Sequence, residues 1–149
     1  MNFYKLKENQ YYLKKKNRKK NKIIFQKDQY WDLKNHKDPD GKKRNLIDEK
    51  KRKLNDLKSE ISFIKRKAKN IKKPRIIDLG SGFGFFLSAF GKKWDKHGIE
   101  ISEQVSQNSK KWANIHKIDI EKKLQKKFND KLKKFDFVFS YHVIEHLAN

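Results

Sequence analysis

The sequence predicts an α/β fold, a Rossmann-like parallel sheet preceded by a basic helical segment, and three observations support this. A short apolar run at residues 75–79 leads into three alternating glycines and then a second apolar run. Strand-like segments alternate with helix-like segments from there to the end of the chain. Before the first strand, apolar residues recur at spacings of three and four, which is typical of an amphipathic helix. Strands that alternate with helices form a parallel sheet covered by helices.

Residues 1–44 form a basic lead whose composition differs from that of the rest. Residues 1–74 hold 26 Lys and Arg against 9 Asp and Glu, whereas residues 75–149 hold 14 against 9, so most of the net charge of +22 lies in the front half. Because like charges repel and the lead has little apolar surface to bury, we expect it to be partly disordered or a frayed helix.

An amphipathic helix is predicted over residues 45–73. Its apolar stripe should pack against the domain that follows, since each large side chain removed from water contributes about 1.5–3 kcal/mol. Pro74 restricts the backbone of the residue before it, so the helix should end there. The residues of the stripe are Leu54, Leu57, Ile61, Ile64, Ala68 and Ile71.

Residues 74–149 are predicted to form a sheet domain that is incomplete. The fourth strand is the last in the chain, and four parallel strands leave an edge strand exposed. We therefore expect a truncated product or a fragment of marginal stability. The strands are expected at residues 75–79, 96–101, 115–120 and 135–141, and the helices at 83–93, 103–114 (capped by Ser102) and 121–133.

Composition narrows the classes of function. The absence of cysteine excludes disulfides and thiolate zinc sites, and it fits a cytoplasmic protein. No apolar run approaches the ~18–20 residues that cross a membrane. A basic front half suits a nucleic-acid or other polyanionic partner, whereas the abundance of Lys with few Arg favours simple compositional bias. The sequence does not indicate an oligomeric state.

The glycine turn after the first strand is the candidate ligand-binding site. Asp78 precedes Gly80, Gly82 and Gly84, which allow a tight turn and close approach of a ligand to bare backbone. A dinucleotide fingerprint would have its third glycine at Phe85, and no Gly-Lys-Ser/Thr triphosphate loop is present. An acid beside such a turn suits a ligand with a cationic amine and no pyrophosphate, such as S-adenosylmethionine.

Residues 75–147 resemble the first half of a class I S-adenosylmethionine-dependent methyltransferase, of the type found among bacterial small-molecule and polysaccharide-cluster enzymes. The resemblance implies that the chain holds the first four strands of that fold and uses S-adenosylmethionine as cofactor. The stretches that carry it are the turn at residues 78–84, Glu100 and Asp119 at the ends of the second and third strands, and residues 135–147.

The resemblance also implies a role for each site residue. Asp78 would face the ammonium of the cofactor, Glu100 would accept hydrogen bonds from both ribose hydroxyls, and Asp119 would accept one from the adenine amino group. Ser140 and Tyr141 end the fourth strand, where ligands bind in open parallel sheets. The residues whose backbone would contact the methionine part are Gly80, Ser81, Gly82 and Gly84.

His142 is the candidate catalytic residue. An acceptor that carries a proton needs a general base, and a histidine with an ordinary pKa of about 6.5 suits that task. His142, Glu145 and His146 also match an inverted zinc-protease pattern, but a protease would not need the glycine turn. Some methyltransferases of this class hold magnesium with a related stretch, in which an acid stands where His142 stands here. We predict no metal site.

Taken together, these features predict an S-adenosylmethionine-dependent methyltransferase that acts on a small-molecule or glycan acceptor and is truncated before its substrate-binding half. A non-catalytic protein with the same cofactor fold and a polyanion-binding front end is the first alternative. A dinucleotide enzyme is the second, and the identities of Asp78 and Phe85 disfavour it.

Overall fold

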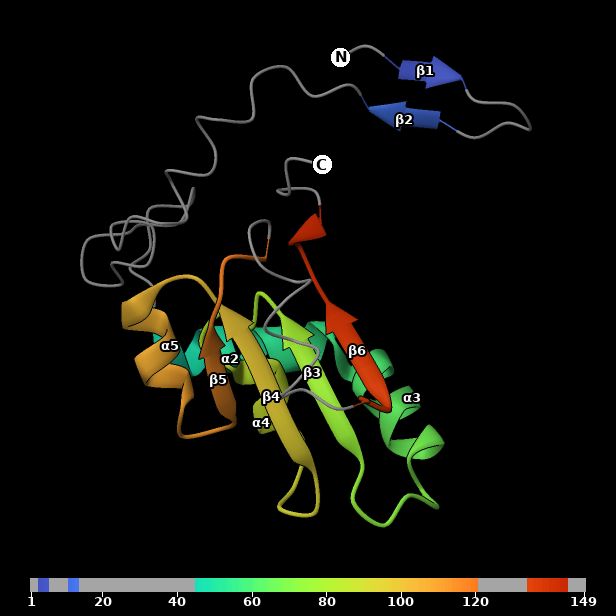
Figure 1. Cartoon of the computed structure of the whole chain (residues 1–149), viewed down its shortest axis with the longest axis vertical. Helices are drawn as coiled ribbons and strands as arrows, with labels where there is room; N and C mark the ends of the chain where they lie inside the picture. Colours follow the sequence, from blue (N-terminus) through green and yellow to red (C-terminus); the bar gives the residue numbers. More distant parts are fainter. Residues whose placement is uncertain (1–2, 6–10, 14–44, 121–133, 145–149) are drawn as a thin grey trace.

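The computed structural model describes residues 3–5, 11–13, 45–120 and 134–144, and its centre is a four-stranded parallel sheet (Figure 1). The strand order is β5-β4-β3-β6, so the chain begins the sheet with an inner strand and adds strands on both sides of it. The predicted Rossmann-like α/β fold is thereby confirmed. The elements are β1 (Phe3–Lys5), β2 (Tyr11–Leu13), α2 (Leu46–Asp56), α3 (Lys58–Lys67), β3 (Arg75–Leu79), α4 (Phe85–Ser88), β4 (Asp95–Glu100), α5 (Glu103–Ser109), β5 (Asn114–Lys117) and β6 (Phe137–Ser140).

Near the amino end of the chain, β1 and β2 pair in antiparallel register, with Tyr4 opposite Tyr12. The sequence predicted no strands for these residues, whose aromatic and apolar types favour them; the expectation that the lead as a whole is partly disordered stays a prediction. The remainder of the lead, up to residue 44, lies outside the described residues.

Two helices, α2 and α3, stand where one was predicted. The Asn45 side chain caps α2 by accepting a hydrogen bond from the backbone N–H of Ile47 at 2.8 Å. The helices are separated only at Leu57, whose backbone turns to φ −100° and ψ 17° while its side chain lies fully in the core. The backbone ladder continues across it, because Ile61 N–H donates to Leu57 C=O at 3.0 Å. The predicted stripe therefore lies along one slightly bent helical arm.

The hydrophobic core fills the space between the helices α2, α3 and α4 and one face of the sheet. Successive residues of a strand point to opposite faces, so Ile76 of β3 and Phe137 and Phe139 of β6 share the face that packs on the helices. Phe86 of α4 stacks on Phe139 with ring centres 3.8 Å apart. The buried core residues are Leu57, Ile61, Ile64, Ala68, Ile76, Phe86, Leu87, Phe90 and Trp94.

The helix predicted at residues 83–93 is much shorter in the structure, where α4 covers only Phe85–Ser88. Ala89 and Phe90 donate their backbone N–H groups to carbonyls three residues back, which tightens the chain out of α-helical geometry. The Ser88 hydroxyl also donates to the Phe85 carbonyl at 2.7 Å. This tight ending brings Phe90 and Trp94 back into the core.

The remaining elements begin or end within a few residues of the prediction. The Ser102 hydroxyl caps α5 by accepting from Val105 N–H at 3.4 Å, as predicted, but α5 ends at Ser109 rather than near residue 114. β5 covers Asn114–Lys117 and β6 covers Phe137–Ser140, so both are shorter than expected. The helix predicted at residues 121–133 lies outside the described residues.

A chain of polar side chains, called here the polar chain, joins three strands on the face of the sheet opposite the core. Arg75 Nε donates to Asp95 Oδ2 at 2.9 Å, and the other oxygen of Asp95 lies 2.9 Å from His97 Nε2. His97 Nδ1 in turn lies 2.9 Å from His116 Nε2. Because the carboxylate can only accept, His97 carries a proton on Nε2 and donates it to Asp95 Oδ1.

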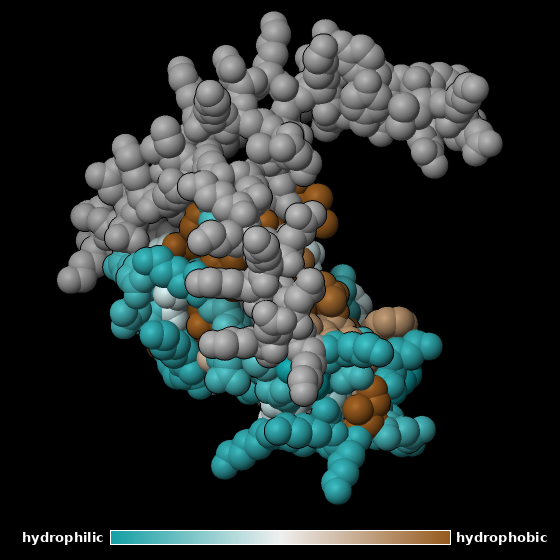
Figure 2. Space-filling model, in the orientation of Figure 1, coloured by the Kyte–Doolittle hydropathy of each residue, from teal (hydrophilic) through white to brown (hydrophobic). Residues whose placement is uncertain are grey.

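On the face that Figure 2 shows, the described residues are mainly hydrophilic, with hydrophobic residues among them. In the part of the chain that the structure describes, no helix combines the length and the apolar character that a membrane span requires.

Candidate functional site

The glycine turn forms the centre of the site. Gly80, Gly82 and Gly84 have φ values of 71°, 52° and 71°, in the left-handed region that side chains with a Cβ rarely adopt. The turn folds back over the sheet, because Ser81 N–H donates to Ile99 C=O of β4 at 2.8 Å. A Cβ added to Gly80 would lie 2.3 Å from Val143 Cγ2, so the backbone here also passes close to the segment after β6.

Asp78 lies directly beneath this turn, near the carboxyl end of β3. Its side chain is buried, and burial raises its pKa to about 8, a rise that the positive charge of Lys53 opposes and the negative charge of Glu100 reinforces. An isolated carboxylate is costly in such a place unless a cation accompanies it. Asp78 is therefore poised to bind a positively charged group.

Glu100 ends β4 beside the same turn, as predicted. One of its oxygens accepts from Gly82 N–H and the other from Ser102 N–H, both at 2.9 Å. Burial raises the pKa of Glu100, and these backbone hydrogen bonds oppose the rise. The carboxylate, to which the Ile101 backbone also hydrogen-bonds, thus links the glycine turn to the start of α5 and retains part of its accepting capacity for a ligand.

Three buried polar atoms near the carboxyl edge have no hydrogen-bond partner among the described residues: Ser81 Oγ, Ser140 Oγ and Trp112 Nε1. Such atoms are uncommon, because each costs about 1–3 kcal/mol when it is left unpaired. Ser81 and Ser140 were both predicted to bind the cofactor, and β6 pairing places Ser140 opposite Leu79, next to the turn. A ligand with several polar groups at this edge would satisfy them.

Two lysines of α2 lie over aromatic rings near the site, and neither contact was predicted; only Lys53 lies over a residue at the end of β6. Lys53 Nζ lies 3.7 Å from the centre of the Tyr141 ring, and Lys50 Nζ lies 3.8 Å from the ring centre of Trp112. Burial lowers the pKa of Lys53, and the charge of Asp78 opposes that fall. A signal was present in the sequence, because Lys53 and Lys50 lie four and seven residues before Leu57 and so extend its stripe.

The segment after β6 adopts an unusual backbone at the predicted catalytic residue. His142 has φ 56°, and it is the one non-glycine residue with a positive φ among those described. Its ring meets the Tyr141 ring edge to face, with centres 4.2 Å apart. Non-glycine residues in this region of φ occur often at functional sites, where surrounding contacts hold the strain.

The structure brings most of the predicted residues together. Asp78, Glu100 and Ser140 lie at the carboxyl ends of adjacent strands around the glycine turn. Asp119 is partly buried, but it lies two residues beyond β5 rather than at its end, because that strand stops at Lys117. Within the described ranges, no group of three or more His, Asp or Glu side chains is arranged to hold a metal ion.

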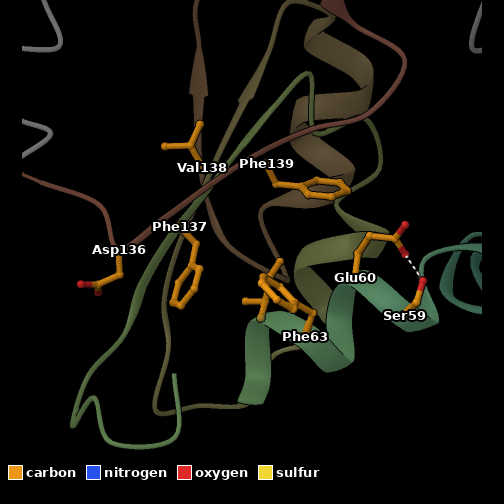
Figure 3. Close-up of a pocket in the computed structure, with 8 residues that line it drawn as sticks. Ser59, Glu60, Phe63, Asp136, Phe137, Val138 and Phe139 are labelled. Atoms are coloured by element: carbon orange, nitrogen blue, oxygen red, sulfur yellow. Dashed lines mark hydrogen bonds between the residues drawn. The ribbon is translucent and has the colours of Figure 1, made fainter. Parts of the chain in front are cut away.

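A hollow of about 590 Å³ lies elsewhere, between α3 and the edge strand β6 (Figure 3). The Phe63, Phe137 and Phe139 side chains surround it, and Glu60 at its rim accepts a hydrogen bond from the Ser59 hydroxyl. None of the predicted site residues lines it, so it is separate from the glycine turn.

Comparisons with known proteins agree with this geometry. A family model described as a methyltransferase domain matches residues 46–149 of the chain. No curated protein sequence matches the chain significantly. Among solved structures, the magnesium protoporphyrin IX methyltransferase of Synechocystis PCC 6803 with bound S-adenosylmethionine has a TM-score of 0.56 and 14% identity, over 87% of this chain and 63% of that one.

A second solved structure is the plantazolicin methyltransferase BpumL in complex with S-adenosylhomocysteine. It has a TM-score of 0.45 and 24% identity, over 81% of this chain and 48% of its own. The chain therefore spans between about half and two thirds of the length of these structural neighbours.

Proposed function

Because the chain belongs to the methyltransferase domain family, we propose that it binds S-adenosylmethionine at the carboxyl edge of its sheet and serves methyl transfer to an acceptor. The observation that supports this best is the buried Asp78 beneath three left-handed glycines. A pyrophosphate would meet a carboxylate there, whereas a cationic amine would find its counter-charge.

The residues present fit this cofactor. Asp78 would hold the ammonium, and the carboxylate of Glu100 would accept hydrogen bonds from the ribose hydroxyls. The unpaired hydroxyls of Ser81 and Ser140 supply further partners at the same edge. Asp119, two residues beyond the end of β5, would accept a hydrogen bond from the adenine amino group.

Bound S-adenosylmethionine supplies a methyl group that is already activated on a sulfonium. The protein's task is therefore mainly to orient the two reactants and to exclude water, which can supply a large part of the rate enhancement. His142 lies one residue after Tyr141, at the end of the strand nearest the turn, and would take the proton from a hydroxyl acceptor.

We propose a small molecule or a glycan as the acceptor. One structural neighbour is a magnesium protoporphyrin IX methyltransferase, which supports an acceptor of small-molecule size. The chain covers less than two thirds of that neighbour, so the acceptor and the activity of these 149 residues alone belong to the proposal. A cytoplasmic location, predicted from the lack of cysteine, is part of the same proposal.

Calorimetric titration of the full chain tests the cofactor. S-adenosylmethionine and S-adenosylhomocysteine should bind with measurable heat, and NAD should not. Binding of NAD with neither of the other two would overturn the proposal in favour of a dinucleotide enzyme. Lys92→Gln, in the exposed loop before β4 and away from the turn, serves as the control variant and should bind like the wild type.

A polyanion-binding role is a second candidate, and the described part of the chain contributes one observation to it. The loops before β3 and β4 meet at the opposite edge of the sheet, where Asp95 N–H donates to Pro74 C=O at 2.9 Å. Their lysine pairs are exposed (72–73 and 92–93), and hydrophilic side chains cover this end of the molecule (Figure 2). Retention on immobilised nucleic acid should then fall steeply with salt; no retention at low salt leaves compositional bias as the explanation.

A further inference from the structure

Two groups that can carry opposite charges lie near the carboxyl end of β3. Asp78 comes from the strand, and Lys53 comes from α2, where its ammonium lies 3.7 Å from the centre of the Tyr141 ring. Tyr141 follows Ser140, and Ser140 pairs with Leu79, the neighbour of Asp78. When both groups are ionised their charges attract each other, but the ion pairs among the described residues do not include one between Asp78 and Lys53.

We propose that Lys53 binds the carboxylate of the ligand's amino-acid end, so that Lys53 and Asp78 together recognise a zwitterion. The inference rests on the proposed function, because S-adenosylmethionine and S-adenosylhomocysteine both end in an α-amino acid. It adds a binding residue that lies outside the glycine turn and outside the strands.

The chemistry of an α-amino acid requires a cation of this kind. Its ammonium and its carboxylate are attached to one carbon, so a residue that holds the ammonium also draws the carboxylate close. Asp78 alone would repel that carboxylate in a buried site, where like charges interact strongly. A lysine on the other side of the ligand converts this repulsion into a second attraction.

The environment of Lys53 fits this task. Burial lowers its pKa, so its ammonium is incompletely compensated before a ligand arrives. The face of the Tyr141 ring holds the ammonium near the edge of the sheet through a cation–π contact, which is weaker than a hydrogen bond to a carboxylate. The lysine is thus kept close to the site without being committed to a protein acid.

Lys50 provides a matched control. It belongs to the same helix, one turn earlier, and its ammonium also lies over an aromatic ring, that of Trp112, at 3.8 Å. It differs from Lys53 in that its ring partner follows α5 rather than β6. A general weakening of α2 packing should affect both variants, whereas recognition of a carboxylate should affect only one.

The test measures the affinity of the full chain for S-adenosylmethionine and for its decarboxylated form, which lacks only the carboxylate. The wild type should prefer S-adenosylmethionine about tenfold, the effect expected of one partly exposed charge-assisted hydrogen bond. Lys53→Gln should lose this preference, because its affinity for S-adenosylmethionine falls while its affinity for the decarboxylated form stays the same. Lys53→Arg should restore most of it, and Lys50→Gln should keep it.

The outcomes are distinguishable. A wild type that binds neither S-adenosylmethionine nor S-adenosylhomocysteine removes the proposed function itself. If the wild type binds and Lys53→Gln binds S-adenosylmethionine equally well or more tightly, the inference is overturned, because Lys53 then competes with the ligand's ammonium. Equal weakening of both ligands by Lys53→Gln also overturns it, since that result describes a lysine that only holds α2 in place.

Discussion

Two clusters of buried or partly buried polar groups lie on the same small sheet, and they differ in how completely their atoms are paired. In the polar chain, Asp95 uses both oxygens and His97 uses both nitrogens in contacts of 2.9 Å. At the carboxyl edge, Asp78 is buried without a direct ion pair, and the hydroxyls of Ser81 and Ser140 have no partner in the described structure.

The difference separates two uses of buried polarity. A cluster whose hydrogen bonds are complete stabilises the fold and has little left to offer a ligand. An incomplete cluster lowers stability until something else completes it, so natural proteins keep one mainly where a ligand binds. Substitutions in the polar chain should therefore mainly lower stability, whereas substitutions at the carboxyl edge should mainly weaken ligand binding.

The largest expected effect is that of Asp78→Asn on cofactor binding. Removing the buried negative charge should weaken the binding of S-adenosylmethionine about 100-fold. Truncating one partner of a buried charge pair typically costs 2–5 kcal/mol, and a 100-fold loss corresponds to about 2.7 kcal/mol. Calorimetry measures this directly. Affinity within threefold of the wild type would show that the ammonium binds elsewhere.

The same variant should make the ligand-free protein more stable in mildly alkaline solution. The folded pKa of Asp78 lies near 8, above its ordinary 3.8, so the folded state keeps a proton that the unfolded chain has lost. Stability therefore falls as pH rises from about 4 to about 8, by up to about 1.4 kcal/mol per pH unit. Urea unfolding across this range should show a clearly shallower fall in Asp78→Asn than in the wild type, because Glu100, whose pKa is also raised, remains in the variant.

Asp95→Ala tests the polar chain and should have the next largest effect. It leaves Arg75 Nε and His97 Nε2 without their acceptor, which should lower the free energy of unfolding by about 2 kcal/mol, at the low end for a partly exposed network. S-adenosylmethionine affinity, measured on the folded variant, should stay within twofold. A large loss of affinity would mean that the polar chain also serves the ligand.

Ser81→Ala should have a smaller effect, with a change of sign between the two measurements. Removing a buried hydroxyl without a partner should raise the stability of the ligand-free protein by about 1 kcal/mol. It should weaken S-adenosylmethionine about fivefold if that hydroxyl binds the ligand. Thermal melts with and without ligand record both effects. Destabilisation of the ligand-free variant would show that the Ser81 hydroxyl makes a stabilising hydrogen bond in the ligand-free protein.

The smallest expected effect concerns the acidic side of the pH range. Burial and then the charge of His97 lower the pKa of His116, so the folded state resists a proton that the unfolded chain accepts. Stability should be complete above about pH 6.5 and fall as pH drops below it. His116→Gln keeps an amide that can hydrogen-bond His97 and should show a shallower fall. An identical pH profile for both proteins would contradict this.

The sequence predicted what depends on neighbouring residues. The three glycines, the Ser102 cap and the stripe through Leu57 and Ile61 all have local signals, and the structure contains them. The end of α4 was misplaced because a compact turn of three-residue hydrogen bonds replaces the helix. No short-range pattern distinguishes that turn from a continuing apolar helix.

The features that were not predicted depend on strand register and on the docking of helices. His97 meets His116 only because β4 and β5 pair with Ile99 opposite His116. Lys53 lies over Tyr141 only because α2, which precedes the sheet in sequence, packs against the sheet. Neither arrangement follows from local composition, since the two partners of each contact are far apart in the chain.

The contact between Val143 and Gly80 has a consequence for how donor and acceptor would be aligned. Because Val143 Cγ2 occupies the volume that a side chain at residue 80 would need, the segment that carries His142 rests on the glycine turn itself. A displacement of the turn must therefore be transmitted to His142 through direct contact. The position of His142, the proposed base, therefore depends on the position of the glycine turn, where the cofactor is proposed to bind.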